Sequence, residues 1–536
     1  MHPLLFAGLV SLGVVFQAPA AMLRGIVIAA DTGQPLPARI YIQAPNGDWL
    51  HPRSESAAGS AVPYSVRRGP HSFEHHTTLS AHPFLIELAL GRHVITVVHG
   101  NEYRELRQEI VVDRQDIELT LPLERWINMA GRGWYSGDTH VHRKLADLPN
   151  ILLAEDVNVA FPLTYWVTQA FQPPTRGDKN TPDAGSALVR VDDTHVIWPR
   201  NTEYEIFTVN GRRHTLGAVF VLNHHRVLDF GVPPVKPLAD ARAAEDGALL
   251  ELDKHNWPWS MALVPLLKVD LFELSNNHLW RTRFAFTNWA EPAGEYMRTG
   301  YDGRNGDEDG WREFGFQNYY ALLNCGFPMT PTAGTASGVH PVPLGFGRVY
   351  VHLNDGFDYE QWRLGLKRGR SFVTTGPMLF ARLNGELPGH QWEAAGFGKP
   401  LAARFTGEVL SAHPLTRIEI LFNGRIIKTV VPENRPTAGN HLRSPIAHAT
   451  SVTESGWFVV RAYERRPDGR IRFAHSAPWH FTVPGRPLRP RKEETDYLIR
   501  RVEEQIERSR GTIPPAAIAE YEKSLSIYRE LAQNAR

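Results

Sequence analysis

The chain contains a single cysteine, Cys325, among its 536 residues. No intramolecular disulfide can therefore form, and a framework stabilised by cross-links is excluded. Cys325 follows the apolar stretch Ala321-Leu322-Leu323, so we expect a buried, inert thiol rather than a nucleophile. After the first 21 residues no stretch is apolar enough to cross a membrane, so we expect no integral membrane span.

The chain also lacks an excess of charge of one sign. The formal net charge is +1, with 58 Lys and Arg against 57 Asp and Glu. Such a balance provides no global field toward nucleic acid or an acidic membrane, and we predict neither as a partner. The chain also lacks a Gly-x-Ser-x-Gly elbow, a Walker loop and a dinucleotide glycine fingerprint, which disfavours a serine hydrolase or a nucleotide enzyme.

The N-terminus resembles a targeting segment. Leu4 to Phe16 is largely apolar, and Gln17-Ala18-Pro19-Ala20-Ala21 ends it with an Ala-x-Ala pattern. This pattern predicts a signal peptide over residues 1–21 and a secreted or periplasmic protein, although the usual positive start is nearly absent. An uncleaved anchor and a buried N-terminal strand are the alternatives.

The length predicts several domains. Short alternating apolar runs predict β-sandwiches on both sides of a middle region in which strands alternate with helices. The predicted divisions are a β-sandwich over 22–125 that resembles carboxypeptidase regulatory-like domains, an α/β domain over 126–377, a second β-sandwich over 378–485 and a helical tail over 486–536.

Local patterns place individual elements. Helical spacing predicts helices over 493–511 and 515–533, packed on the body of the protein or forming a homo-oligomer with another subunit. Gly91, between two apolar runs, predicts a hairpin. Asn423-Gly424 predicts a second hairpin. Residues 305–310 superficially resemble a calcium loop, but position twelve would be Phe316, so we interpret them as a solvated acidic loop.

The strongest functional signal is Gly137-Asp138-Thr139-His140-Val141-His142. Side chains two apart on a strand point to the same face, so both imidazoles can converge on one metal ion. A His-x-His pair alone is a weak signal, since surface or core histidines give the same pattern. The recurrence of His and Glu downstream favours a metal site.

The segment from Tyr135 to His142 resembles the first motif of the PHP (polymerase and histidinol phosphatase) metallohydrolases, and more closely their CehA/McbA-like branch. The resemblance runs from about residue 132 to 379. Four further stretches support it: 198–205, 254–258, 272–277 and 369–377. It implies a distorted seven-stranded (β/α)7 barrel in the middle of the chain, with metals at the C-terminal ends of its strands.

The resemblance also implies a ligand set. His140 and His142 match the first motif, and Glu203 matches the bridging glutamate of the family, with Glu205 as an alternative. His255 matches a His-Pro motif, and His278 is a further candidate. The implied cofactor is one or two divalent ions of zinc, manganese or iron.

Two family motifs are altered. Thr164-Tyr165-Trp166 stands where the family has Thr-Asp-His, and Ala336 replaces a late aspartate. His340 could take over from that aspartate if the loop follows a different path. Asp138 could orient His140 or act on the attacking water, or it could be an ordinary turn residue.

These features predict a hydrolase that uses metal-activated water on a phosphoester, ester or amide-like bond of a small molecule or glycan. The alternative is a catalytically decayed PHP scaffold that binds a glycan or surface ligand. A glycosidase with Glu203 and Glu205 as its acid pair is a weaker idea, because residues two apart on a strand serve poorly as opposed acid and base.

Overall fold

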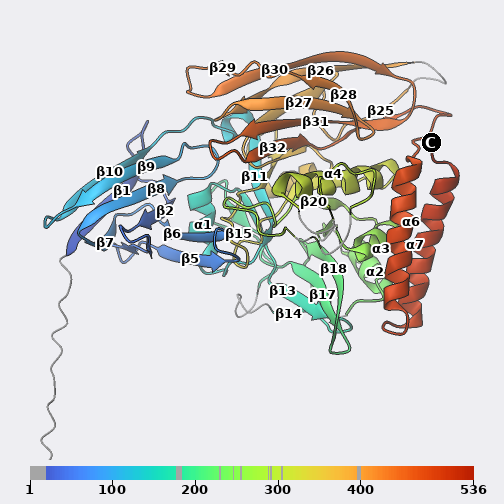
Figure 1. The fold of residues 1–536 in the computed structure, drawn as a ribbon, viewed down its shortest axis with the longest axis horizontal. Coiled ribbons are helices and arrows are strands. Elements are labelled where there is room, and N and C mark those ends of the chain that lie inside the picture. Colours follow the sequence, from blue (N-terminus) through green and yellow to red (C-terminus); the bar gives the residue numbers. More distant parts are fainter. Residues whose placement is uncertain are drawn as a thin grey trace, which may run out of the picture.

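The computed structural model describes residues 20–176, 184–228, 231–245, 247–253, 256–287, 289, 293–302, 306–394 and 400–536. Residues 1–19 of the predicted signal peptide therefore lie outside the described residues. The protein is multidomain and rich in β-sheet (Figure 1). None of the helices in the described ranges is long and apolar enough to span a bilayer.

Residues 20–123 form two sheets around a core of their own. The sheets have the strand orders β10-β1-β7-β4 and β5-β6-β2-β8-β9, and β3 joins the second. Buried aliphatic side chains such as Leu23, Ile40 and Ile95 fill the space between them. The strands are β1 (Ala20–Ala29), β2 (Ala38–Gln43), β3 (Trp49–Leu50), β4 (Arg53–Ser54), β5 (Ala61–Arg67), β6 (Phe73–Leu79), β7 (Phe84–Ala89), β8 (Gly91–Val98), β9 (Leu106–Val112) and β10 (Ile117–Leu123).

The hairpin predicted at Gly91 is wrong. Strand β7 pairs with β1 and β4, whereas β8 pairs with β2 and β9, so the chain changes sheet at this turn. Gly91 has φ 126°, a conformation that a residue with a side chain rarely adopts. Alternation and a turn residue indicate two strands but not their partners.

The middle region contributes strands to two further sheets. A seven-stranded sheet has the order β14-β13-β17-β18-β19-β20-β21. Strands β11, β12 and β16 run parallel to one another in the other sheet. The strands are β11 (Trp134–Val141), β12 (Val159–Pro162), β13 (Tyr165–Gln169), β14 (Thr175–Arg176), β15 (Val189–Arg190), β16 (Val196–Ile197), β17 (Thr202–Val209), β18 (Arg212–Leu222), β19 (Leu249–Leu252), β20 (Leu271–Ser275), β21 (Thr330–Ala333), β22 (Arg348–His352) and β23 (Ser371–Thr374).

One short helix precedes β11, and the other helices of this region lie between these strands in the chain. They are η1 (Ala130–Arg132), α1 (Leu148–Glu155), α2 (Lys236–Ala244), α3 (Pro258–Leu267), α4 (Glu308–Asn324) and α5 (Tyr359–Lys367). Asp307 caps α4 by accepting from the Gly310 amide, so part of the acidic loop serves as a helix start. Cys325 is buried at the C-terminal end of α4, as expected.

The C-terminal strands continue the sheet that contains β11. The order β11-β22-β23-β32-β31-β27-β28 runs without a break, because β23 pairs with β32. The predicted hairpin at Asn423-Gly424 joins β27 to β28. The strands are β24 (Met378–Leu383), β25 (Gln391–Glu393), β26 (Leu401–Ser411), β27 (Leu415–Phe422), β28 (Arg425–Val430), β29 (Arg435–Pro436), β30 (Leu442–Val452), β31 (Gly456–Arg465), β32 (Ile471–Ser476) and β33 (Trp479–Thr482).

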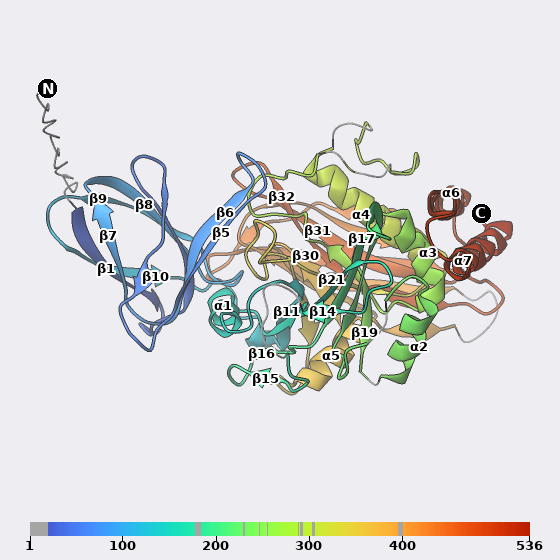
Figure 2. The ribbon, with the colours of Figure 1, turned by 90° about the horizontal axis from the view of Figure 1, so that it is seen from below.

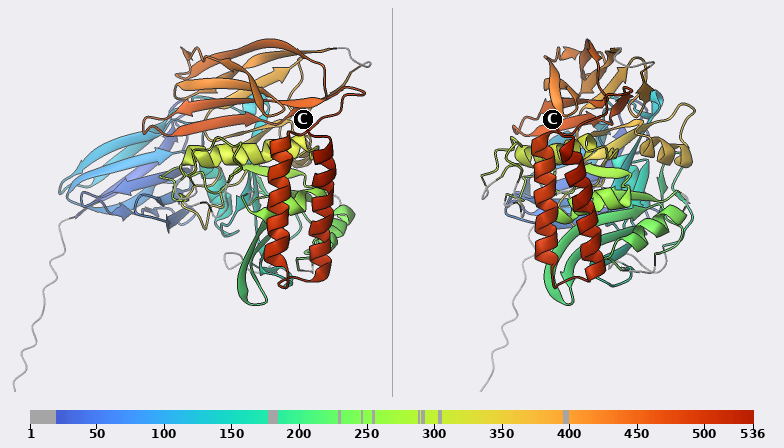
Figure 3. Two further views of the ribbon diagram at one scale, coloured as in Figure 1. Left: turned by 45° about the vertical axis from the view of Figure 1, so that its right-hand side comes forward. Right: turned by 90° about the vertical axis from the view of Figure 1, so that its right-hand side faces the viewer.

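The two C-terminal helices form a hairpin at the end of the molecule opposite the N-terminal strands (Figures 2 and 3). They are α6 (Lys492–Ser509) and α7 (Pro515–Gln533), close to the predicted ranges. Trp259 of α3 donates to the Tyr521 hydroxyl over 2.8 Å, and Tyr528 donates to the Met261 carbonyl over 2.9 Å. The apolar face of the hairpin therefore packs on the body of its own chain. An association with another subunit stays a prediction.

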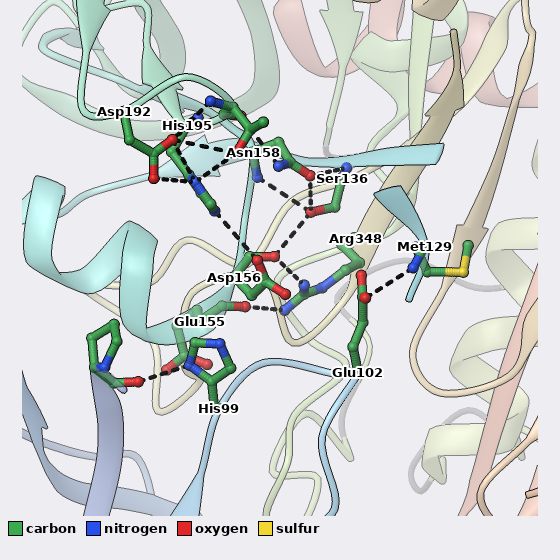
Figure 4. Close-up of polar contacts among 12 residues, drawn as sticks. His99, Glu102, Met129, Ser136, Glu155, Asp156, Asn158, Asp192, His195 and Arg348 are labelled. Atoms are coloured by element: carbon green, nitrogen blue, oxygen red, sulfur yellow. Dashed lines mark hydrogen bonds and ion pairs between the residues drawn. The ribbon is translucent and has the colours of Figure 1, made fainter. Parts of the chain in front are cut away.

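The end of α1 anchors a polar network at the junction with the N-terminal strands (Figure 4). Arg348 donates to the carbonyls of Glu155 and Asp156 over 3.0 and 2.9 Å. A guanidinium in this position satisfies the last carbonyls of a helix and complements its dipole. The Asp156 carboxylate lies 3.3 Å from His195, whose other ring nitrogen lies 2.9 Å from Asp192.

This network makes stability depend on pH through His195. Burial lowers the pKa of His195, but Asp156 and Asp192 outweigh that effect and raise the pKa above its usual 6.5. A histidine whose folded-state pKa is raised stabilises the protein below its unfolded pKa, and the contribution is lost as the pH rises through the folded value.

We therefore expect His195→Gln to lower the free energy of unfolding on the order of 1 kcal/mol at about pH 6 and less at about pH 9. Urea unfolding of both proteins at the two pH values measures this difference. Equal losses at both values would contradict the assigned charge on His195.

Candidate metal centre

Strand β11 brings His140 and His142 together at its C-terminal end. The two Nε2 atoms lie 3.1 Å apart, and both side chains are buried. The strand is buried along its whole length, so the alternation of side chains points both imidazoles into one interior space. The structure thus places the two histidines as a pair that can share one ion.

Glu203, near the start of β17, completes a first group of donors. Its carboxylate lies 3.2 Å from His142 Nε2 and 3.9 Å from His140 Nε2. His140, His142 and Glu203 form a set of ligand atoms that all lie within 4.8 Å of one another. Glu205, the alternative in the sequence, does not belong to this set in the described part of the chain.

A second group contains two carboxylates that sequence reasoning missed. Asp253 and Glu273 join His140 in a set with the same mutual limit of 4.8 Å. Glu273 lies 3.1 Å from His140 Nδ1. Asp253 directly follows β19, and Glu273 lies within β20, which is parallel to β19. The feature of the sequence that could have identified these two acids is an acidic residue at the end of a short apolar run.

The donor set suits a divalent transition metal. Two imidazoles and three buried carboxylates provide the mixed nitrogen and oxygen ligation that zinc, manganese and ferrous iron accept. Two groups that share His140 also suit either one or two ions. The residues therefore fit the predicted cofactor.

Two aromatic side chains cover the histidines. Phe220 of β18 packs edge-on against His140 at 4.6 Å between ring centroids, and Trp166 of β13 lies 5.1 Å from His142. These contacts limit rotation of the imidazoles and reduce the access of water. Trp166 therefore gives His142 an apolar cover.

Asp138 lies beneath the histidines and holds the surrounding backbone. It accepts from the amides of His140, Thr335 and Gly345 and from the Thr335 hydroxyl, at 2.6 to 3.2 Å. Burial raises the pKa of Asp138 to about 6, and these donors act against that rise. This geometry supports positioning of the His140 backbone.

Glu251 of β19 is a second buried acid that contacts β11. It accepts from the hydroxyls of Thr139 and Thr332 over 2.7 and 2.6 Å. Burial, reinforced by nearby Asp253 and Asp138, raises the pKa of Glu251 to about 8. A carboxyl group that stays protonated at neutral pH adds no further negative charge to this crowded interior.

The segment after β21 runs along β11 and is hydrogen-bonded to the backbone of both histidines. The His142 amide donates to the Ser337 carbonyl over 2.8 Å, and the Ala336 amide donates to the His140 carbonyl over 2.7 Å. Ala336 has φ 46°, an unusual conformation for a residue with a side chain. Ala336 thus takes part in the backbone pairing with β11.

The N-terminal strands also reach this segment. The Tyr64 hydroxyl of β5 donates to the His340 carbonyl and accepts from the Gly338 amide over 2.9 Å. The Arg143 guanidinium lies 3.6 Å from the centre of the Tyr64 ring and donates to the Ser337 hydroxyl over 3.0 Å. Tyr64 from the N-terminal strands and Arg143, just after β11, therefore both hold the segment that follows β21 in place.

The remaining predicted site residues lie elsewhere or are not described. The ring of His278 lies 5.7 Å from that of His340, and both pack against Phe286. Neither belongs to a metal-binding group within the described ranges. His255 lies outside the described residues. His224, buried beside Thr202, has its pKa lowered to about 4 by burial and holds the turn after β18.

Comparisons with protein-family models, with curated proteins and with solved structures gave no match. The function is therefore argued from the residues and their geometry.

A substitution at Gly338 tests whether the segment after β21 stabilises the histidine pair. A Cβ at this position would lie 2.1 Å from the His142 carbonyl oxygen, and φ is 120°. We expect Gly338→Ala to lower the free energy of unfolding by about 2–3 kcal/mol, because backbone cannot move as easily as a side chain.

Gly356→Ala is the matched control. Gly356 also has a positive φ, 87°, but no atom lies within 4 Å of the added Cβ. Its expected cost is about 1 kcal/mol. Thermal or urea unfolding compares the two, and equal losses would show that the close approach to His142 is not significant.

Proposed function

We propose that this protein is a metal-dependent hydrolase of the PHP type, related to the CehA/McbA-like branch. The observation that carries the proposal is the buried group of His140, His142 and Glu203, extended by Asp253 and Glu273. Buried imidazoles and carboxylates this close together are costly without a cation to share.

The position of the group within the sheets supports the same proposal. Its ligands from β11, β19 and β20 lie at or just after the C-terminal end of a strand or within it, whereas Glu203 lies near the start of β17. Bonds between β11 and the segment after β21 bring the two sheets of the middle region together. We propose that these strands form the distorted barrel of the family, in which sites occupy this end.

The chemistry follows from the donor set. A divalent ion held here would lower the pKa of water toward about 7 and polarise the scissile bond of a phosphoester, ester or amide-like substrate. His140, His142 and Glu203 would hold the ion. Glu273 orients His140 through Nδ1. Phe220 and Trp166 exclude bulk water from the imidazoles.

We include the predicted secreted or periplasmic location in the proposal, on the pattern of residues 1–21. A small molecule or glycan is the proposed substrate class.

Metal content is the first test. We expect protein purified without chelators to contain about one or two divalent ions per chain, and His140→Ala/His142→Ala to lose them. Elemental analysis measures both. His71→Ala/His413→Ala, two histidines of the N- and C-terminal strand regions, should retain the wild-type content. Retention of metal by the His140/His142 variant would refute the assignment.

Hydrolysis is the second test. Glu203→Gln keeps the size of the side chain but removes its charge, so we expect kcat/KM on p-nitrophenyl phosphate or p-nitrophenyl acetate to fall at least about a hundredfold. Glu205→Gln, the neighbouring acid on the same strand, should cost much less. Equal effects of the two variants would contradict the choice of Glu203 as a ligand.

Trp166 favours one second candidate, a decayed scaffold that binds a glycan or surface ligand. Its ring occupies the place of a family ligand, packs against His142 and is partly exposed. Aromatic faces commonly stack on sugars. Protein that takes up no metal even after reconstitution, yet binds glycans saturably, would favour this candidate over the hydrolase.

A further inference from the structure

A cavity of about 1200 Å³ lies at the other end of the strands that carry the candidate metal centre. Asp270 and Thr330, at the beginnings of β20 and β21, line it. Glu273 is three residues further along, or about 10 Å at the rise of a β-strand. Residues between β24 and β25, together with Pro478 and His480, form the opposite wall. The cavity is thus a separate space at a junction of sheets.

The lining is strongly basic. Five cationic side chains line the cavity: Lys268, Lys367, Arg368, Arg370 and Arg382. Its acidic lining consists of Asp270 and Glu386. Asp270 accepts from Arg242 over 2.6 Å and lies 3.4 Å from Lys367, and Glu386 lies 3.5 Å from His390. Asp270 is therefore already balanced by Arg242 and Lys367, and the lining retains an excess of cationic side chains.

Helix ends account for part of the positive charge. Lys268 follows α3, and Lys367 and Arg368 end α5, where cations complement the helix dipole. These three residues alone would be an ordinary feature of helix C-termini.

Arg370 and Arg382 have no such explanation, because one precedes β23 and the other lies on β24. Burial lowers the pKa of His352, which also lines the cavity, and the positive charges of Arg382 and Arg370 lower it further, so both charges act on the same imidazole. Arg382 donates to the Gly385 carbonyl over 2.9 Å, a contact that fixes the side chain without neutralising it. Two exposed like charges beside a histidine form a local site of positive potential.

Part of the remaining lining is apolar and suits the neutral part of a ligand. Phe327, Leu387 and Pro388 lie among the lining residues. The volume is that of a pocket for a small molecule, in which apolar walls supply contact area and a few charged groups orient the ligand.

We propose that this cavity binds a small organic anion with a phosphate or carboxylate group. Arg370 and Arg382 hold the anionic group, and the apolar body lies against Phe327 and Leu387. Planar guanidinium groups bind both kinds of oxyanion through paired hydrogen bonds. The proposal is independent of the metal chemistry, since the residues of the two sites do not overlap.

Calorimetric titration tests the proposal with three probes: phenyl phosphate, inorganic phosphate and benzoate. All titrations contain EDTA and use the His140→Ala/His142→Ala background, so that binding at the candidate metal centre cannot contribute. We expect saturable binding of one anion per chain, with phenyl phosphate tighter than inorganic phosphate. A preference for phenyl phosphate or for benzoate distinguishes a phosphorylated from a carboxylate ligand.

Arg370→Gln/Arg382→Gln should weaken the tightest probe at least tenfold, or about 1.4 kcal/mol. The control Arg404→Gln/Arg425→Gln removes two exposed arginines of β26 and β28 and should leave the dissociation constant unchanged. No saturable binding of any probe, or equal weakening in both variants, would overturn the proposal.

A measurement on the unsubstituted cavity keeps the test independent of variant folding. The anion should raise the pKa of His352 in an NMR titration of the histidine resonances, because it offsets the two guanidinium charges. An unchanged His352 pKa at saturating phenyl phosphate would place the anion elsewhere and refute the site.

Discussion

The structure depends on the complete burial of β11 between its neighbours. All eight residues of this strand are buried, and it pairs with β12 on one side and β22 on the other. Gly137 allows the close packing of Trp362, because a Cβ there would lie 2.4 Å from the indole. With β11 fixed by its neighbours, the directions of His140 and His142 follow from the pleat alone.

The interior around these histidines contains more acid than an ordinary core. Asp138 and Glu251 are held by hydroxyl and amide donors, whereas Glu203, Asp253 and Glu273 belong to the groups that include His140. Burial of so many carboxyl groups favours protonation or a bound cation. The raised pKa of Glu251 favours protonation of that one acid at neutral pH. A metal ion suits the acids that lie beside the imidazoles.

Sequence alone could predict the parts of this site that depend on local geometry. The spacing of His140 and His142 on a strand needs only the alternation of side chains, and Glu203 followed from a resemblance. Asp253 and Glu273 come from separate strands, and their approach to His140 depends on strand pairing that no local pattern encodes. The same limit explains the wrong hairpin at Gly91, whereas the two C-terminal helices were predictable from their own apolar spacing.

The pairing of β23 with β32 has a consequence for how the chain can be divided. The sheet passes from the candidate metal centre into the C-terminal strands without a break, so no point between them is a natural end of a folding unit. A fragment that ends near residue 377 would carry β23 as an open edge, with unpaired amides and carbonyls along it. Such an edge recruits strands from other molecules, so the shorter protein would tend to aggregate rather than fold as a smaller domain.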